Sequence, residues 1–270
     1  MAAEMIQIDD PDDERLADFV GLRDRELRTR ADSQQPEVAV FIAEGDIVVE
    51  RALRAGYELR ALLVDATRES LPVGLPTDAA VYGAGREVVT RITGMGVHRG
   101  SMGVFLRREL PSPAAVMAGA RRLVVAEGVV NPINLGVIIR SAAGLGMDGL
   151  LLDSASVDPL YRRASRVSMG EVFDLPYSRI GSLPDALDDI VAAGFTTVAL
   201  TPDATAESLD EISFTSGERV ALVLGSEGPG LTDETMQRCD RRVRIPLSGR
   251  VDSLNVGSAA AVAFYAISRC

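Results

Sequence analysis

The chain lacks the residues on which several common kinds of catalytic site depend. It has no tryptophan, no lysine, one histidine (His98) and two cysteines (Cys239 and Cys270) among 270 residues. No Ser-His-Asp, Cys-His or metal-ligand set can be assembled from these in the C-terminal half, so we expect no metal and no nucleophilic cysteine there. Aromatic residues make up only 4%, which argues against a stacking surface for single-stranded nucleic acid.

Long apolar runs are also missing. No run reaches the roughly 18 residues of a membrane span, and the acidic N-terminus does not resemble a signal peptide. Together with the scarce cysteines, this predicts a soluble protein of a reducing cytoplasm.

The charge balance alone decides nothing about partners. A net charge of −11 counts against a nucleic-acid partner. However, residues 1–14 hold six carboxylates and are predicted to be a disordered acidic tail. All 28 basic residues are arginine, which suits bidentate phosphate contacts, although codon bias in a GC-rich genome is the favoured explanation.

Strand and helix patterns alternate twice along the chain. The first round predicts a small α/β domain over residues 15–110, and a linker over residues 111–120 begins with Pro111–Ser112–Pro113. The second round, residues 121–270, predicts a parallel sheet covered by helices on both faces. Two apolar runs there, Val220–Leu224 and Val243–Leu247, end in glycine-rich loops, and α/β folds bind ligands where such strands end.

Three stretches and one helix of the second domain could supply catalytic or ligand-binding residues. In the first, E-G-V-V-N-P-I-N-L-G-V-I-I-R, Asn134 can cap a helix whose apolar run is interrupted by Arg140. A guanidinium in such a helix needs an anionic partner or a cleft, or else it reaches from the helix to solvent.

The second stretch is the loop G-S-E-G-P-G at Gly225–Gly230. Its three glycines allow close approach of a ligand to the backbone, but its spacing matches neither the P-loop nor the dinucleotide-binding motif. A tight turn would explain the glycines but not Glu227.

The third stretch is I-P-L-S-G-R-V-D-S-L-N-V-G-S at Ile245–Ser258, where Ser253 and Asn255 precede a helix of small residues. Ser and Asn at a helix start are ordinary caps. The helix, Tyr161–Arg166 (Y-R-R-A-S-R), has Arg162, Arg163 and Arg166, which suit either phosphate binding or a solvated face.

Together these stretches resemble the SpoU/TrmH family of RNA ribose 2′-O-methyltransferases in the SPOUT superfamily. The match is N-x-G-x-x-x-R at Asn134–Arg140, G-S-E-G-x-G at Gly225–Gly230, and I-P-L followed by S-L-N-V-G at Ile245–Gly257. The first domain, with E-G at Glu44–Gly45 and H-R-G at His98–Gly100, is similar to the family's RNA substrate-binding domain, which itself resembles a small ribosomal protein.

This resemblance implies a C-terminal domain tied in a deep trefoil knot, S-adenosylmethionine as cofactor, and a homodimer. Arg140 would be catalytic, positioned by Asn134, with Glu227, Ser253 and Asn255 shaping the active site. The residues implied to bind the cofactor are Leu224, Gly225, Gly228, Ile245, Pro246 and Leu254. Those expected to contact RNA are Arg140, Arg162, Arg163, Arg166, His98 and Arg99.

The substrate expected from the resemblance is 23S ribosomal RNA, with transfer RNA as the runner-up. Because a guanidinium is effectively always charged, Arg140 is expected at least to stabilise a developing alkoxide, and its action as a base stays open. A catalytically inactive RNA-binding or ribosome-assembly factor is an alternative of another class. A Rossmann oxidoreductase is disfavoured because the dinucleotide fingerprint is missing.

Overall fold

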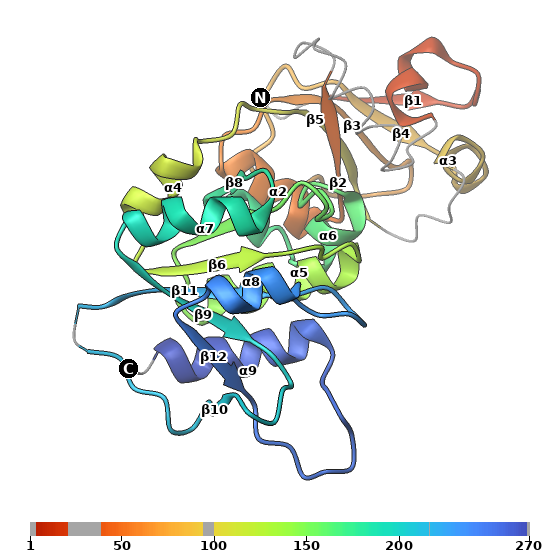
Figure 1. Ribbon diagram of the computed structural model, residues 1–270. Helices are drawn as coiled ribbons and strands as arrows, with labels where there is room; N and C mark the ends of the chain where they lie inside the picture. The colour runs from red at the N-terminus through yellow and green to blue at the C-terminus, as the bar shows by residue number, and fades with distance from the viewer. Residues whose placement is uncertain (1–3, 21–38, 94–99, 216, 269–270) are drawn as a thin grey trace. The chain divides into compact units, whose positions relative to one another are not determined.

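The computed structural model describes residues 4–20, 39–93, 100–215 and 217–268 (Figure 1). The chain divides into two compact units. Unit 1 comprises Met1–Glu109 and Leu160–Asp174, and unit 2 comprises Leu110–Pro159 and Leu175–Cys270. Within the described ranges, no helix has the length and apolar character needed to cross a membrane.

Unit 1 is built on a mixed five-stranded sheet of order β1-β4-β3-β5-β2. The first three of these strands are parallel, while β5 is antiparallel to both of its neighbours. The strands are β1 (Met5–Ile8), β2 (Val40–Glu44), β3 (Leu59–Asp65), β4 (Val81–Ala84) and β5 (Met102–Leu106), and the helices are η1 (Glu14–Phe19), α2 (Asp46–Arg54) and α3 (Arg86–Thr93).

The prediction of a disordered tail over residues 1–14 is wrong for its described part. Met5–Ile8 pairs with Val81–Ala84 as an edge strand, and Asp13 caps η1. Ile8, Leu16 and Phe19 are buried in the core of unit 1. The apolar residues of this segment are few, but their burial outweighs the acidic composition on which the prediction rested.

Leu160–Asp174 belongs to unit 1, although the predicted boundary assigns it to the second domain. It contains α6 (Arg162–Val167) and η3 (Glu171–Phe173). Glu44, at the end of β2, accepts hydrogen bonds from Arg162 at 3.0 Å and Arg166 at 2.7 Å. The Phe173 ring lies 5.5 Å from that of Phe41. Ion pairs and ring packing together hold this segment on unit 1.

Unit 2 contains a seven-stranded sheet of order β10-β12-β9-β11-β6-β7-β8, and every pairing in it is parallel, as the sequence predicts. Its strands are β6 (Arg122–Ala126), β7 (Gly149–Leu152), β8 (Tyr177–Arg179), β9 (Phe195–Leu200), β10 (Glu207–Ser208), β11 (Arg219–Leu224) and β12 (Arg241–Arg244). Its helices are α4 (Pro113–Gly119), α5 (Pro132–Gly144), α7 (Leu183–Ala192), α8 (Asp233–Arg238) and α9 (Val256–Ser268).

Both faces of this sheet are buried. On one face, Val125 and Val223 pack in a core to which α4 and α7 contribute, together with Leu231 before α8 and Met236 within it. The alternate residues Val124 and Leu222 point to the opposite face and are also fully buried. Helices α5 and α9 pack against each other, as Figure 1 shows.

The predicted linker at residues 111–120 is folded. Ser112 caps α4 by accepting a hydrogen bond from Ala115 N, and Pro113 occupies the first turn. Val116 and Met117 are buried in the core of unit 2. The proline that suggested a linker instead starts a helix, because proline at the first helical position costs no hydrogen bond.

The last predicted strand is displaced toward the N-terminus. The structure ends β12 at Arg244, so most of the apolar run Val243–Leu247 follows the strand rather than forming it. Of this run, Val243 pairs with Leu200 and Glu207, and Arg244 pairs with Ser208. The remaining residues of the run are thereby free to line a ligand site at the carboxyl end of the strand.

We expect Glu44→Gln to destabilise unit 1 by about 1–3 kcal/mol, because it weakens the charged hydrogen bonds of a half-buried arginine. The side chains of Arg162 and Glu44 are each 15% exposed, whereas that of Arg166 is 64% exposed. Arg166→Ala is the matched control and should cost less than about 1 kcal/mol. Urea unfolding of both variants tests this, and equal losses would contradict it.

Candidate functional site

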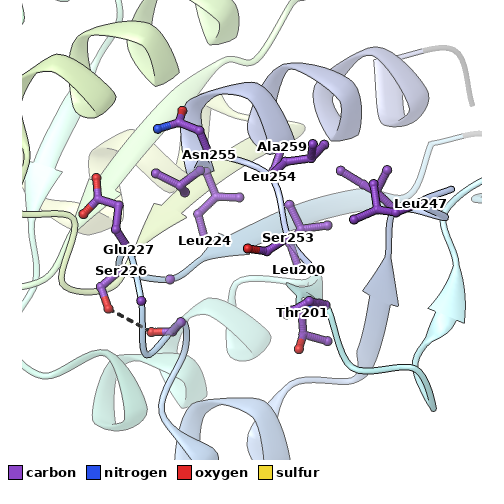
Figure 2. Close-up of a pocket in the computed structure, with 16 residues that line it drawn as sticks. Leu200, Thr201, Leu224, Ser226, Glu227, Leu247, Ser253, Leu254, Asn255 and Ala259 are labelled. Atoms are coloured by element: carbon purple, nitrogen blue, oxygen red, sulfur yellow. Dashed lines mark hydrogen bonds between the residues drawn. The ribbon is translucent and has the colours of Figure 1, made fainter. Parts of the chain in front are cut away.

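A cavity of about 360 Å³ lies at the carboxyl ends of β9, β11 and β12 in unit 2 (Figure 2). This volume is in the range of small-molecule sites, and the position is the one where parallel sheets bind ligands. It is lined by Leu200, Thr201, Pro202, Leu224, Gly225, Ser226, Glu227, Gly228, Gly230, Ile245, Leu247, Ser253, Leu254, Asn255, Val256 and Ala259.

The loop after β11 folds back on itself. Ser226 N donates to Gly230 O and Gly230 N to Ser226 O, both at 3.2 Å. A Cβ atom at Gly225 would lie 2.3 Å from Gly230 C and Leu231 N, so only glycine fits there. Gly228 has φ of +89°, a conformation that favours glycine. The glycines thus serve the tight turn and also shape one wall of the cavity.

Asn134 connects three segments that are far apart in the sequence. Its side chain is buried, and its Nδ2 donates to Glu227 Oε1 of the glycine-rich loop. Its Oδ1 accepts a hydrogen bond from Asn255 Nδ2 at 3.0 Å. The second and third sequence motifs therefore meet at the first motif. Figure 2 shows Glu227 and Asn255 on the same side of the cavity, with Leu247 on the other.

Asn255 acts both as a helix cap and as part of this network. Its Oδ1 accepts hydrogen bonds from Gly257 N at 3.0 Å and Ser258 N at 3.4 Å. This capping leaves the Asn255 amide group to donate to Asn134. Gly257 lets α9 approach α5 closely, since a Cβ atom there would lie 2.8 Å from Val137 Cγ1.

Arg140 lies on α5, the helix that carries Asn134, and is exposed. It is not one of the residues lining the cavity. Among the residues that the structure describes, its guanidinium has no hydrogen-bond or ion-pair partner. It is therefore available to an anion from outside this unit.

Most of the predicted site residues gather at the cavity. Glu227, Ser253 and Asn255 line it, as do all but one of the predicted cofactor-binding residues, namely Leu224, Gly225, Gly228, Ile245 and Leu254. Pro246 is exposed and does not line it. Sequence reasoning missed Leu200, the last residue of β9, and Thr201 and Pro202, which follow it; none of them belongs to a motif.

None of the described residues predicted to bind RNA lines this cavity. Arg162 and Arg166 belong to unit 1, where they pair with Glu44, and Arg163 is exposed. Ion pairing occupies two of the three guanidinia, which a sequence pattern cannot reveal. His98 and Arg99 lie outside the described residues.

Cys239, the cysteine in the described part of unit 2, is not activated as a nucleophile. Burial raises the pKa of the Cys239 thiol to about 11, so this cysteine is a poor nucleophile at neutral pH. Over the described part of the chain, no cluster of three His, Cys, Asp or Glu side chains could hold a metal ion.

Comparison with known proteins identifies the family. The model of the SpoU rRNA Methylase family matches residues 121–265. The chain belongs to this family. It is therefore an RNA methyltransferase of the SpoU family, and the match covers most of the unit that contains the cavity.

Curated relatives match along almost the whole chain. An uncharacterized tRNA/rRNA methyltransferase of Mycobacterium tuberculosis is 42% identical over 96% of this chain and 90% of its own length. The 23S rRNA (guanosine(2553)-2′-O)-methyltransferase RlmP of Bacillus subtilis is 28% identical over 97% of this chain and 98% of its own length.

Solved structures share the fold. An rRNA methyltransferase of Sinorhizobium meliloti with bound AdoMet superimposes with a TM-score of 0.77 at 25% identity, covering 98% of each chain. A second structure, of an RNA 2′-O ribose methyltransferase, gives a TM-score of 0.76 at 29% identity over 98% of each chain.

Gly225→Ala should destabilise the protein by about 1–3 kcal/mol or more, because the new methyl group would collide with backbone atoms. Gly144→Ala is the matched control, since nothing lies within 4 Å of a Cβ atom there. At the end of α5 it should be neutral or stabilising by up to about 1 kcal/mol. Thermal unfolding measures both, and an equally stable Gly225→Ala variant would contradict the assigned crowding.

Proposed function

We propose that this protein transfers the methyl group of S-adenosylmethionine to a ribose 2′-hydroxyl, with 23S ribosomal RNA as the substrate. The observation that carries the proposal is the network in which Asn134, on the helix of Arg140, bonds two lining residues of the cavity, Glu227 and Asn255. The three motifs of the family thus converge on one place.

The cavity suits S-adenosylmethionine in size and in chemistry. Leu224, Ile245 and Leu254 supply apolar surface for an adenosine group, and the backbone of the glycine-rich loop is open to close contact. Glu227 is the charged residue in the lining, and a carboxylate complements a cationic ligand. Bound S-adenosylmethionine supplies a methyl group that is already activated by a sulfonium, so the protein needs mainly to align the acceptor.

Arg140 is the group that would act on the ribose hydroxyl. An arginine side chain carries a positive charge in proteins, so it would stabilise the alkoxide that develops as the hydroxyl loses its proton. The buried contacts of Asn134 fix α5 relative to the cavity and so fix the backbone from which Arg140 extends. Because a charged guanidinium cannot accept a proton, the hydroxyl proton would pass to an RNA phosphate or to water.

Ribosomal RNA is favoured over transfer RNA by the match to RlmP, a 23S rRNA methyltransferase, over almost the full length of both chains. That match includes unit 1, which we propose as the RNA-binding part. The exposed Arg163 would contribute there, together with Arg162 and Arg166 if their pairing with Glu44 is exchanged for RNA phosphate.

The deep trefoil knot implied by the family resemblance and the homodimer form part of the same proposal. Helix α9 carries two exposed apolar side chains one turn apart, Val262 at 44% and Tyr265 at 49% exposure. An exposed apolar strip beside a buried face is typical of a protein interface. Helix α9 follows the cavity directly, so a dimer formed there would bring a second chain near the site.

Purified protein should transfer label from methyl-labelled S-adenosylmethionine to ribosomal RNA, at the 2′-oxygen. In Arg140→Ala, kcat should fall by about 10²–10³-fold, the range for loss of one group that stabilises an oxyanion. Binding of S-adenosylmethionine, measured by calorimetry, should be unchanged.

The matched control is Arg121→Ala, an exposed arginine at the amino end of β6, away from the cavity; it should keep full activity. Full activity in Arg140→Ala would refute the role of Arg140. Cofactor binding without transfer to any RNA would instead indicate a knotted assembly factor.

In solution we expect a mass of twice 28.7 kDa by light scattering at micromolar concentration. Replacing both Val262 and Tyr265 by glutamate should shift the protein toward the monomer, because charges are poorly tolerated in the core of an interface. A wild-type protein that is monomeric at this concentration would refute the dimer.

A further inference from the structure

Glu127 is a buried carboxylate that no sequence motif explains. It follows β6 directly and is 7% exposed. The described residues provide it with hydroxyl and amide donors but no cation within ion-pair distance. A buried acid is stable only when its oxygens are well bonded, and here both of them are.

The hydrogen bonds of Glu127 reach both ends of the glycine-rich loop. Its backbone N donates to Leu224 O at 2.8 Å, where the loop leaves β11. Its Oε2 accepts from Thr232 N at 2.9 Å, where the loop enters α8. Its Oε1 accepts from Thr232 Oγ1 at 3.0 Å and from Thr235 Oγ1 at 2.7 Å. One residue thus closes the base of the loop.

We propose that Glu127 is a positioning residue for the cofactor cavity, which it shapes by clamping the glycine-rich loop without lining the cavity itself; this inference rests on the function proposed above. The loop Gly225–Gly230 forms one wall of the cavity, and its internal bonds span only Ser226 and Gly230. Fixing the two ends limits the conformations of the loop before the cofactor binds. Binding therefore costs less conformational entropy.

The clamp depends on a group that only accepts hydrogen bonds. A carboxylate can accept at both oxygens, from the Thr232 amide on one side and the two hydroxyls on the other. In Glu127→Gln, one position must be taken by an NH₂ group. If it faces the Thr232 amide, two donors oppose each other, and if it faces the hydroxyls, both must reorient. Either arrangement loosens the base of the loop with little change in side-chain volume.

The test compares Glu127→Gln with Asp148→Asn in the full-length protein. Asp148 accepts hydrogen bonds from Arg121 N at 2.8 Å and Arg122 N at 2.7 Å, at the opposite end of β6. It therefore controls for general loss of stability. Glu127→Gln should raise the KM for S-adenosylmethionine about tenfold. This is the change expected when one hydrogen bond to a charged group no longer holds the loop in its binding conformation. The KM for RNA should not change, and Asp148→Asn should leave both values unchanged.

A second readout does not depend on activity. Amide hydrogen exchange over residues 225–235 should be faster in Glu127→Gln than in the wild type, and unaltered in Asp148→Asn. Should Glu127→Gln fail to fold, Thr235→Val removes one donor to Glu127 and should accelerate exchange over the same residues. Unchanged exchange and unchanged KM would overturn the clamp. A wild type that binds no S-adenosylmethionine would refute the proposed function, and the exchange measurement would still decide the role of Glu127.

Discussion

The organisation of the cavity depends on the burial of one polar side chain, Asn134. A buried amide must find partners for both its donor and its acceptor groups, and Asn134 finds them on two other segments of the chain. The glycine-rich loop and the start of α9 are thereby held against the start of α5. A charged side chain could not make both contacts, because the group at this position donates to a carboxylate and accepts from a second amide at once.

Much of the site could be predicted from the sequence because its residues come in short local motifs. Asn255 caps α9. The prediction that Asn134 caps α5 is wrong, because Asn131 is the cap; Asn134 lies in the first turn, so local capping patterns still drew attention to both asparagines of the site. What could not be predicted came from contacts between distant residues. Thr201 reaches the cavity only because β9 lies between β11 and β12, and Glu127 acquires its role from threonines more than a hundred residues later.

The alternation of strands and helices sufficed for the parallel sheet of unit 2, because fully buried strands have a strong apolar signal. The predictions based on composition were less successful. The acidic residues before Arg15 obscure a strand whose burial rests largely on Ile8, and Pro113, which suggests a linker by composition, starts a helix. In both places the structure follows the packing of a few side chains, although the amino-acid composition of the segment as a whole suggests otherwise.

The assignment of Leu160–Asp174 to unit 1 bears on how such a protein could evolve or be dissected. The chain passes between the units three times, after Glu109, before Leu160 and after Asp174. Cutting near residue 110 would strip Phe173 of its aromatic neighbours Phe41 and Tyr57 and leave Arg162 without Glu44. Unit 1 is therefore not an appendage that can be exchanged by recombination at a single junction. Any swap of the N-terminal part between relatives must carry the matching inserted segment with it.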